Sequence, residues 1–193
     1  MGHTARKIVV STFAMFGVFA LSLIVSQRYY PLASVAAAPG ASREMVRLQK
    51  FYLGTWDYTE TYEKTPSAPR AGVNTGVYKS ELGPGGNSLI NHFHSQGPVG
   101  DYEGLLIMTW APKEKAYEAY IFGNDFPGGI VETGNFEGET LVFRAEMTIG
   151  DRKFSMRNST QMDEKGKMTS DEFLAAGGAP ERLFVRILAT RKP

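Results

Sequence analysis

Two of the three histidines stand close together and are the residues best suited to chemistry in this chain. His92 and His94 lie two positions apart in the β-rich run SLINHFHSQ, so on a strand both imidazoles point to the same face. Such a pair supplies two ligands of a metal site, which needs a third or fourth. Metal binding, contact with an organic ligand and a surface or structural role therefore remain open. Our site prediction uses the pair as polar ligand contacts and includes no metal.

Aromatic and arginine side chains within the predicted strands add further candidate contacts. Trp110 and Tyr120 would line an apolar cavity, although core packing explains most of the aromatic content. An inward Arg144 or Arg157 would meet a ligand carboxylate through paired hydrogen bonds. Alternation with apolar neighbours favours outward, solvated arginines, unless the interior is polar. The predicted ligand-binding residues are His92, His94, Trp110, Tyr120, Arg144 and Arg157.

Residue patterns typical of enzymes are missing from the sequence. The chain has no cysteine and no Gly-x-Ser-x-Gly, which excludes thiol catalysis, disulfides, Cys-ligated zinc and the serine-hydrolase elbow. Two carboxylate pairs occur, Asp163-Glu164 in a turn sequence and Asp171-Glu172 within a strand run. We expect both pairs to be structural or solvated. We predict no catalytic residue and no cofactor.

The charge balance argues against nucleic acid as a partner. The formal net charge of the 193 residues is +1, and three of the cations, Arg6, Lys7 and Arg28, lie in or beside the N-terminal segment. The rest of the chain is slightly acidic, which gives no electrostatic footprint for nucleic acid or anionic lipid. The length suits one domain with an extension.

The N-terminus predicts export. Behind Arg6-Lys7 an uncharged run of 19 residues extends from Ile8 to Ser26, and as a helix it would span about 28 Å. A cleaved signal peptide and a retained membrane anchor both fit residues 1–26, and the small residues 34–38 offer a cleavage site. In either case the folded part is periplasmic or otherwise extracytoplasmic, with a membrane contact if the leader stays.

The remaining sequence predicts a linker, a short helix and an all-β domain. Residues 27–42 are rich in Ala and Pro and form the linker. Ser42 is the expected N-cap of an amphipathic helix that ends at Gly54. Nine turn sequences then separate ten β-rich runs. The runs cover 55–63, 73–81, 88–95, 102–110, 116–123, 130–136, 140–148, 153–162, 167–174 and 182–191.

Short turns between the runs favour antiparallel pairing of neighbours. A ten-stranded meander removes its two exposed edges by closing into a barrel. We therefore predict that residues 43–193 form one closed β-barrel whose helix covers one mouth. A two-sheet sandwich is the alternative, disfavoured because long crossovers are not visible.

A resemblance supports this fold. The run from Leu48 to Trp56, with its Gly54-Thr55-Trp56 entry, resembles the opening of lipocalin-like (calycin) barrels. Gly85-Gly86 and Tyr102-x-Gly104 resemble an uncharacterised bacterial family of lipocalin-like domains of unknown function. The resemblance implies that Gly54 turns the helix into the first strand and Trp56 fills the closed end. It lends no activity, and haem held through a histidine near the C-terminus is not implied, since no histidine follows His94.

These features lead to a first hypothesis of a non-catalytic binding protein for a small hydrophobic or amphiphilic molecule. Two alternatives remain open. One is a structural or envelope-interaction domain without a ligand. The other is a calycin-type enzyme that uses His92 and His94.

Overall fold

The computed structural model describes residues 40–193 except 66–69 and 150. The leader and nearly all of the linker lie outside the described residues, so the predictions for export, cleavage and anchoring remain predictions. Within the described part, no helix is long and apolar enough to cross a membrane.

Helix α1 (Arg43–Tyr52) begins where the sequence predicted. Ser42 is its N-cap, and its Oγ accepts a hydrogen bond of 3.2 Å from the backbone N–H of Met45. This bond satisfies one of the amides that the first turn leaves free. Met45 and Leu48 lie one turn apart on the same face and are buried, so the helix is held by its apolar side.

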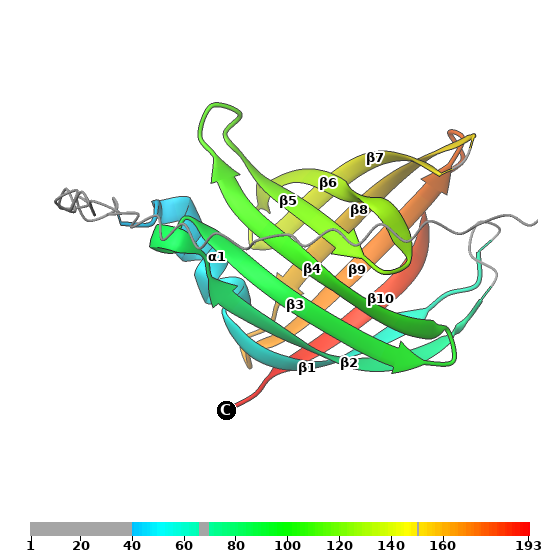
Figure 1. The fold of residues 1–193 in the computed structure, drawn as a ribbon, viewed down its shortest axis with the longest axis horizontal. Coiled ribbons are helices and arrows are strands. Elements are labelled where there is room, and N and C mark those ends of the chain that lie inside the picture. The colour runs from blue at the N-terminus through cyan, green and yellow to red at the C-terminus, as the bar shows by residue number, and fades with distance from the viewer. Residues whose placement is uncertain (1–39, 66–69, 150) are drawn as a thin grey trace, which may run out of the picture. The chain divides into compact units, whose positions relative to one another are not determined.

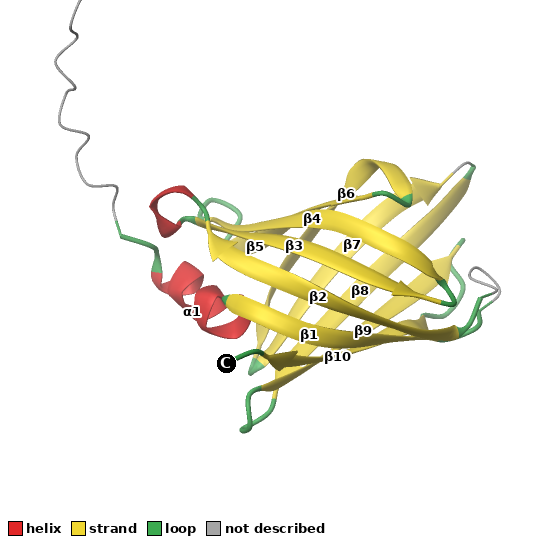
Figure 2. Cartoon of the chain, turned by 60° about the horizontal axis from the view of Figure 1, so that its bottom comes forward, coloured by secondary structure: helices red, strands yellow, loops and turns green. Residues whose placement is uncertain are grey.

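Ten antiparallel strands follow and close into a barrel (Figures 1 and 2). Each strand pairs with the next along the chain, and β1 pairs with β10 to complete the circle, Trp56 opposite Arg191 and Tyr62 opposite Val185. The predicted meander is confirmed. The strands are β1 (Gly54–Tyr62), β2 (Gly72–Leu82), β3 (Ser88–Gly97), β4 (Gly100–Ala111), β5 (Ala116–Gly123), β6 (Phe126–Glu137), β7 (Thr140–Ile149), β8 (Arg152–Met162), β9 (Lys167–Ala176) and β10 (Arg182–Arg191).

Strand β6 begins earlier than predicted. The sequence Asn124–Gly129 was expected to be a turn, but Phe126 already pairs with Gly123 across a two-residue turn. Gly128 and Gly129 adopt φ values of 88° and 74°, which glycine tolerates best. The β5–β6 register shifts between Ile121 and Gly123. The glycines therefore form an irregularity inside the strand pair rather than a longer loop.

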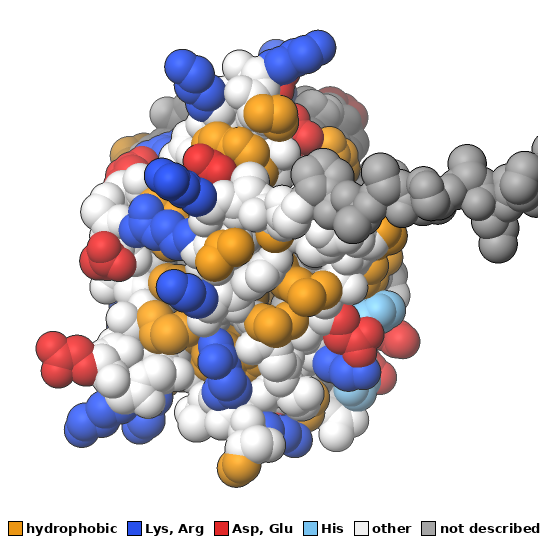
Figure 3. Space-filling view, turned by 90° about the vertical axis from the view of Figure 1, so that its left-hand side faces the viewer, with side chains coloured by type: hydrophobic (Ala, Val, Ile, Leu, Met, Phe, Trp, Pro, Cys, Tyr) orange, Lys and Arg blue, Asp and Glu red, His pale blue; other side chains and the backbone are white. Residues whose placement is uncertain are grey.

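One end of the barrel, called the helix end below, is covered by α1 and filled with apolar side chains. Met45 and Leu48 of α1 pack there with residues from five strands. Figure 3 looks onto this end, where hydrophobic side chains lie between lysines and arginines. The buried strand residues of this cluster are Leu89, Met108, Tyr117, Ala119, Leu141 and Phe143.

Candidate ligand-binding cavity

The barrel interior contains a cavity of about 190 Å³. Helix α1 and all ten strands contribute to its wall, because each strand turns every second side chain inward. Much of the wall is aliphatic or aromatic, as at Leu106, Ile121, Phe143 and Ile187. A cavity of this size with a largely apolar lining is suited to a small organic molecule.

Three aromatic rings form parts of the wall by lying over glycines. Tyr58 is the direct cross-strand partner of Gly76, Phe93 of Gly104, and Phe143 of Gly134. A Cβ on Gly76 would lie 2.6 Å from Cζ of Tyr58, and one on Gly134 would lie 2.8 Å from Cδ1 of Phe143. At each pair the missing side chain makes room for the neighbouring ring, so the glycines shape the cavity.

Glu132 on β6 is the most unusual group of the wall. It is only 3% exposed, and its Oε1 has no hydrogen-bond partner. Burial raises the pKa of this carboxyl to about 7, because the charged form loses its hydration. An unpaired buried carboxylate is costly, so the position is not explained by stability.

Glu172 on β9 is the second acidic group in the cavity. Asn158 on β8 donates from Nδ2 to Oε1 of Glu172 at 3.2 Å. Thr160 and Ser170 both donate to Oδ1 of Asn158, at 2.9 and 2.8 Å, which fixes the orientation of this amide. Burial, with a smaller contribution from the nearby carboxyls of Glu132 and Glu60, raises the pKa of Glu172 to about 8.

Glu60 on β1 is the third acid of the wall and lies toward the end opposite α1. Its Oε2 accepts hydrogen bonds from Ser95 at 2.6 Å and from the Tyr62 hydroxyl at 3.0 Å. Burial raises its pKa, and these two hydrogen bonds counteract the rise. Beyond Glu60, the ring of Tyr62 packs against Tyr102 and Phe184, with centroids 5.9 and 5.7 Å away. Aromatic side chains thus lie between the cavity and this end.

The cavity wall offers acidic groups without basic ones. None of its eighteen lining residues, all of them in the described part of the chain, is Lys, Arg or His. Asn91 adds a further acceptor, since its Nδ2 donates to the carbonyl of Leu106 at 3.1 Å and its Oδ1 has no partner. A carbonyl can only accept, so the amide orientation is determined and Oδ1 is left free.

The predicted histidines lie on the outer wall. Asn91 and Phe93 line the cavity, so the alternation of β3 turns His92 and His94 outward, and both are exposed. Nε2 of His94 lies 2.9 Å from Oδ1 of Asp101. The sequence predicted both imidazoles as ligand contacts, and neither of them lines the interior cavity.

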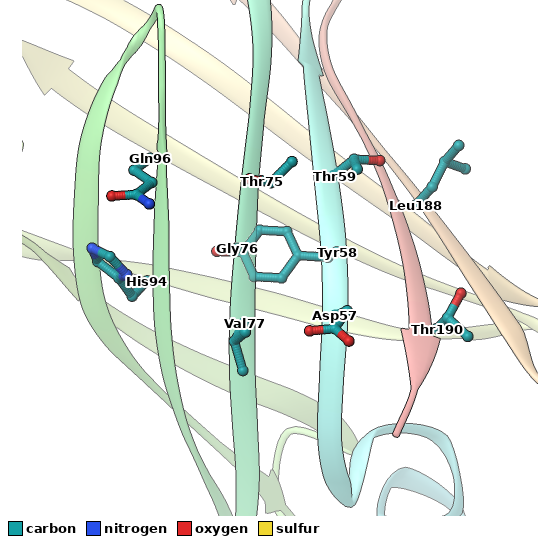
Figure 4. A pocket seen from close by; sticks show the side chains of 10 residues that line it. All are labelled: Asp57, Tyr58, Thr59, Thr75, Gly76, Val77, His94, Gln96, Leu188 and Thr190. Atoms are coloured by element: carbon teal, nitrogen blue, oxygen red, sulfur yellow. The ribbon is translucent and has the colours of Figure 1, made fainter. Parts of the chain in front are cut away.

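His94 instead borders an open groove of about 580 Å³ over β1, β2, β3 and β10 (Figure 4). Most side chains around the groove are exposed, including Val77 and Leu188. Figure 4 also shows the Tyr58 ring reaching toward Gly76. A ligand in this groove would stay in contact with solvent, so the smaller interior cavity is the better site.

The other four predicted contacts also lie away from the cavity lining. Trp110 packs at the helix end against Tyr117, with ring centroids 5.0 Å apart. The Tyr120 hydroxyl donates to Glu118 at 2.6 Å. The two arginines form outer ion pairs, Arg144 with Glu137 at 3.1 Å and Arg157 with Glu181 at 2.8 Å. Both arginines therefore point outward, as their alternation with apolar neighbours predicted.

The entry into β1 closes the helix end. Gly54 has φ 119°, a conformation in which a side chain would be strained, and it directs the chain from α1 into the strand. Trp56 is fully buried, donates from Nε1 to the carbonyl of Tyr52 at 2.8 Å and stacks on Tyr78 at 5.6 Å. Arg191 lies over the same indole, 4.5 Å from the ring centre.

The sequence reasoning missed the three cavity carboxyls. Asp171-Glu172 was expected to be structural or solvated. Asp171 is on the outer wall, where it pairs with Arg186 at 2.6 Å, whereas Glu172 lines the cavity. Glu172 alternates along β9 with Met168 and Ser170, and all three side chains line the cavity. This alternation was the sequence pattern that could have identified Glu172 as an inward residue. Among the described residues, no three His, Asp or Glu side chains converge as a metal site.

Comparison with known proteins supports the fold. No protein-family model matches the sequence, and no curated protein matches it. Rv2717c from M. tuberculosis, a solved structure, is similar over 79% of this chain and 99% of its own, with a TM-score of 0.60 and 12% identity. The S-type phycobiliprotein lyase CPES from Guillardia theta matches 79% of this chain and 98% of its own, with a TM-score of 0.48 and 8% identity. The similarity to Rv2717c supports a lipocalin-like barrel fold.

Proposed function

We propose that this chain is an exported, non-catalytic binding protein whose barrel holds a small, partly apolar molecule. The observation that carries the proposal is the interior cavity of about 190 Å³, with an aliphatic and aromatic wall and polar atoms left without partners. Most buried polar groups of folded proteins have a hydrogen-bond partner, so two unpaired acceptors on the wall of one cavity call for an explanation. A ligand that contacts them gives these groups a role.

Export is the second part of the proposal. It is supported by the uncharged run Ile8–Ser26 behind Arg6-Lys7. Cell fractionation with N-terminal sequencing of the isolated protein tests it. An extracytoplasmic chain that begins near residue 38 indicates cleavage, and one that retains residues 1–26 in the membrane fraction indicates an anchor. Recovery in the cytoplasm would contradict export.

Native mass spectrometry of the full chain, purified from its source, tests ligand binding. We expect a population whose mass exceeds that of the chain by a small organic molecule. Ala119→Phe is the variant for comparison, because Ala119 is 1% exposed and lines the cavity. Ala71→Phe makes the same change at an exposed position outside the strands. Loss of the extra mass only in Ala119→Phe supports the cavity as the site, and an unchanged mass in both variants would contradict it.

A further inference from the structure

The side-chain amides in the cavity wall already donate to protein acceptors, whereas two buried acceptors of the wall have no partner. Nδ2 of Asn91 donates to Leu106 and Nδ2 of Asn158 donates to Glu172. The Tyr78 hydroxyl lies 3.9 Å from Sδ of Met168, as a donor to the sulfur. Oε1 of Glu132 and Oδ1 of Asn91 remain without partners. An occupant that brings N–H groups would satisfy these two acceptors.

The charge of the wall also favours an occupant that brings hydrogen-bond donors. Glu132 and Glu172 lie among lining residues that include no basic side chain. A low-dielectric site with carboxyls of one sign attracts a cation more strongly than an exposed acid does. The rings of Tyr58, Tyr78 and Phe93 on the same wall present π systems, to which organic cations are attracted as well.

We infer that the cavity selects a small molecule in which a positively charged nitrogen is attached to a compact apolar body, with its N–H groups directed to Glu132. The inference rests on the proposed binding function and names its ligand class. Glu172 and Oδ1 of Asn91 provide further acceptors on the same wall. An anionic ligand would face unpaired carboxyls, and a neutral apolar one would leave Oε1 of Glu132 unsatisfied.

The size of the cavity limits the apolar body to about one ring. An apolar protein cavity of about 150 Å³ holds benzene, so about 190 Å³ accommodates one ring with a short substituent. Benzylamine is therefore a suitable probe, because it is cationic at neutral pH. Benzyl alcohol and benzoate have the same ring and nearly the same size, but they are neutral and anionic.

Protonation of the site provides an independent readout. The pKa values of Glu132 and Glu172 are raised to about 7 and about 8, so each carboxyl is protonated in a fraction of the molecules at pH 7. A bound cation favours the ionised form, so binding releases protons. The other titratable groups that interact with this pair are Glu60, Asp125, Tyr52, Tyr58 and Tyr62. Burial raises the pKa of each of them and so also favours the protonated form.

Titration calorimetry on the full chain, in two buffers of different ionisation enthalpy, tests the inference. We expect benzylamine to bind about tenfold more tightly than benzyl alcohol, the effect of one charge-assisted hydrogen bond, with proton release at pH 7. Benzoate should bind most weakly. Glu132→Gln should remove most of the preference for the amine and reduce the proton release to the part that Glu172 supplies, while binding of benzyl alcohol persists. Glu146→Gln, an exposed substitution on β7, should change neither.

The outcomes separate the two proposals. Equal binding of benzylamine and benzyl alcohol, unaffected by Glu132→Gln, would overturn the cation preference and leave the binding function standing. Tighter binding of benzoate would overturn it as well. Failure of all three probes to bind, together with a bare chain in native mass spectrometry, would overturn the binding function itself.

Discussion

The helix end and the middle of the barrel interior are built on opposite principles. At the helix end, Leu48, Trp56 and Leu89 are fully buried, and the one polar atom of Trp56 has its partner in the carbonyl of Tyr52. In the middle, Glu132 and Asn91 are also buried, at 3% exposure each, but both keep an acceptor without a partner. The helix end is filled by apolar side chains, whereas the middle is hollow and carries a buried carboxyl without a partner.

The two regions therefore contribute differently to the stability of the barrel. Packed apolar side chains stabilise the fold by about 1.5–3 kcal/mol each, whereas a buried carboxyl without a partner destabilises it. The filled helix end thus offsets the cost of the acidic middle. Natural proteins keep such unfavourable groups mainly where they have a role beyond folding, which is why the proposed binding site lies in the middle and not at the helix end.

Leu48→Ala should have the largest effect on stability. Leu48 is fully buried between α1 and the strands, so truncation leaves a cavity and should lower the free energy of unfolding by about 3 kcal/mol. Val46→Ala on the same helix is the control, because Val46 is exposed and its truncation should cost about 0.5 kcal/mol or less. Denaturant titration measures both variants. Equal effects at the two positions would show that the helix end is not the packed anchor.

Rising pH should destabilise the unliganded protein. The pKa values of Glu132 and Glu172 are raised from 4.5 to about 7 and about 8, so between pH 4.5 and 8 the folded state holds more protons than the unfolded state. The free energy of unfolding therefore falls as pH rises through this window. Glu132 alone should account for a fall of about 2.5 kcal/mol between pH 5 and 8, and Glu132→Gln should remove that part and stabilise the protein at pH 8. A flat profile, identical in both proteins, would show that these carboxyls are not desolvated.

The sequence predicted the elements well because turns are encoded locally. Gly, Pro, Asn and Asp mark nine connections, and the structure places ten strands between them. The site was harder because it depends on which face of each strand points inward. The run 102–110 is apolar on both faces, and His92 and His94 look more functional than Phe93 between them. An acid in a strand usually points to solvent, so Glu132 gave no signal, and the parity that Glu172 shares with Met168 and Ser170 became informative only once the register was known.

Gly104→Ala tests whether the cavity wall needs its glycines. A Cβ there would overlap the ring of Phe93 and the backbone carbonyl of Phe122, so the ring must shift. We expect a loss of about 1.5 kcal/mol in the free energy of unfolding, as for other overpacked sites, with weaker binding of benzylamine. Gly40→Ala is the control, since a Cβ at Gly40 meets nothing within 4 Å. Unchanged binding and stability in Gly104→Ala would show that the ring does not depend on the missing side chain.

The smallest change in stability is expected for substitutions of the adjacent acids Asp171 and Glu172, and the two substitutions should change stability in opposite directions. Asp171 points outward and accepts two hydrogen bonds from Arg186, at 2.6 and 2.8 Å, whereas Glu172 points into the cavity with no basic partner among the lining residues. Asp171→Asn should lower stability only slightly, and high salt should abolish the difference, because exposed ion pairs are weak and screened. Glu172→Gln should raise stability at pH 8 at any salt concentration, because it removes a desolvated charge. Denaturant titrations at low and high salt measure both, and a loss of stability in Glu172→Gln at pH 8 would show that this carboxylate is paired rather than left for a ligand.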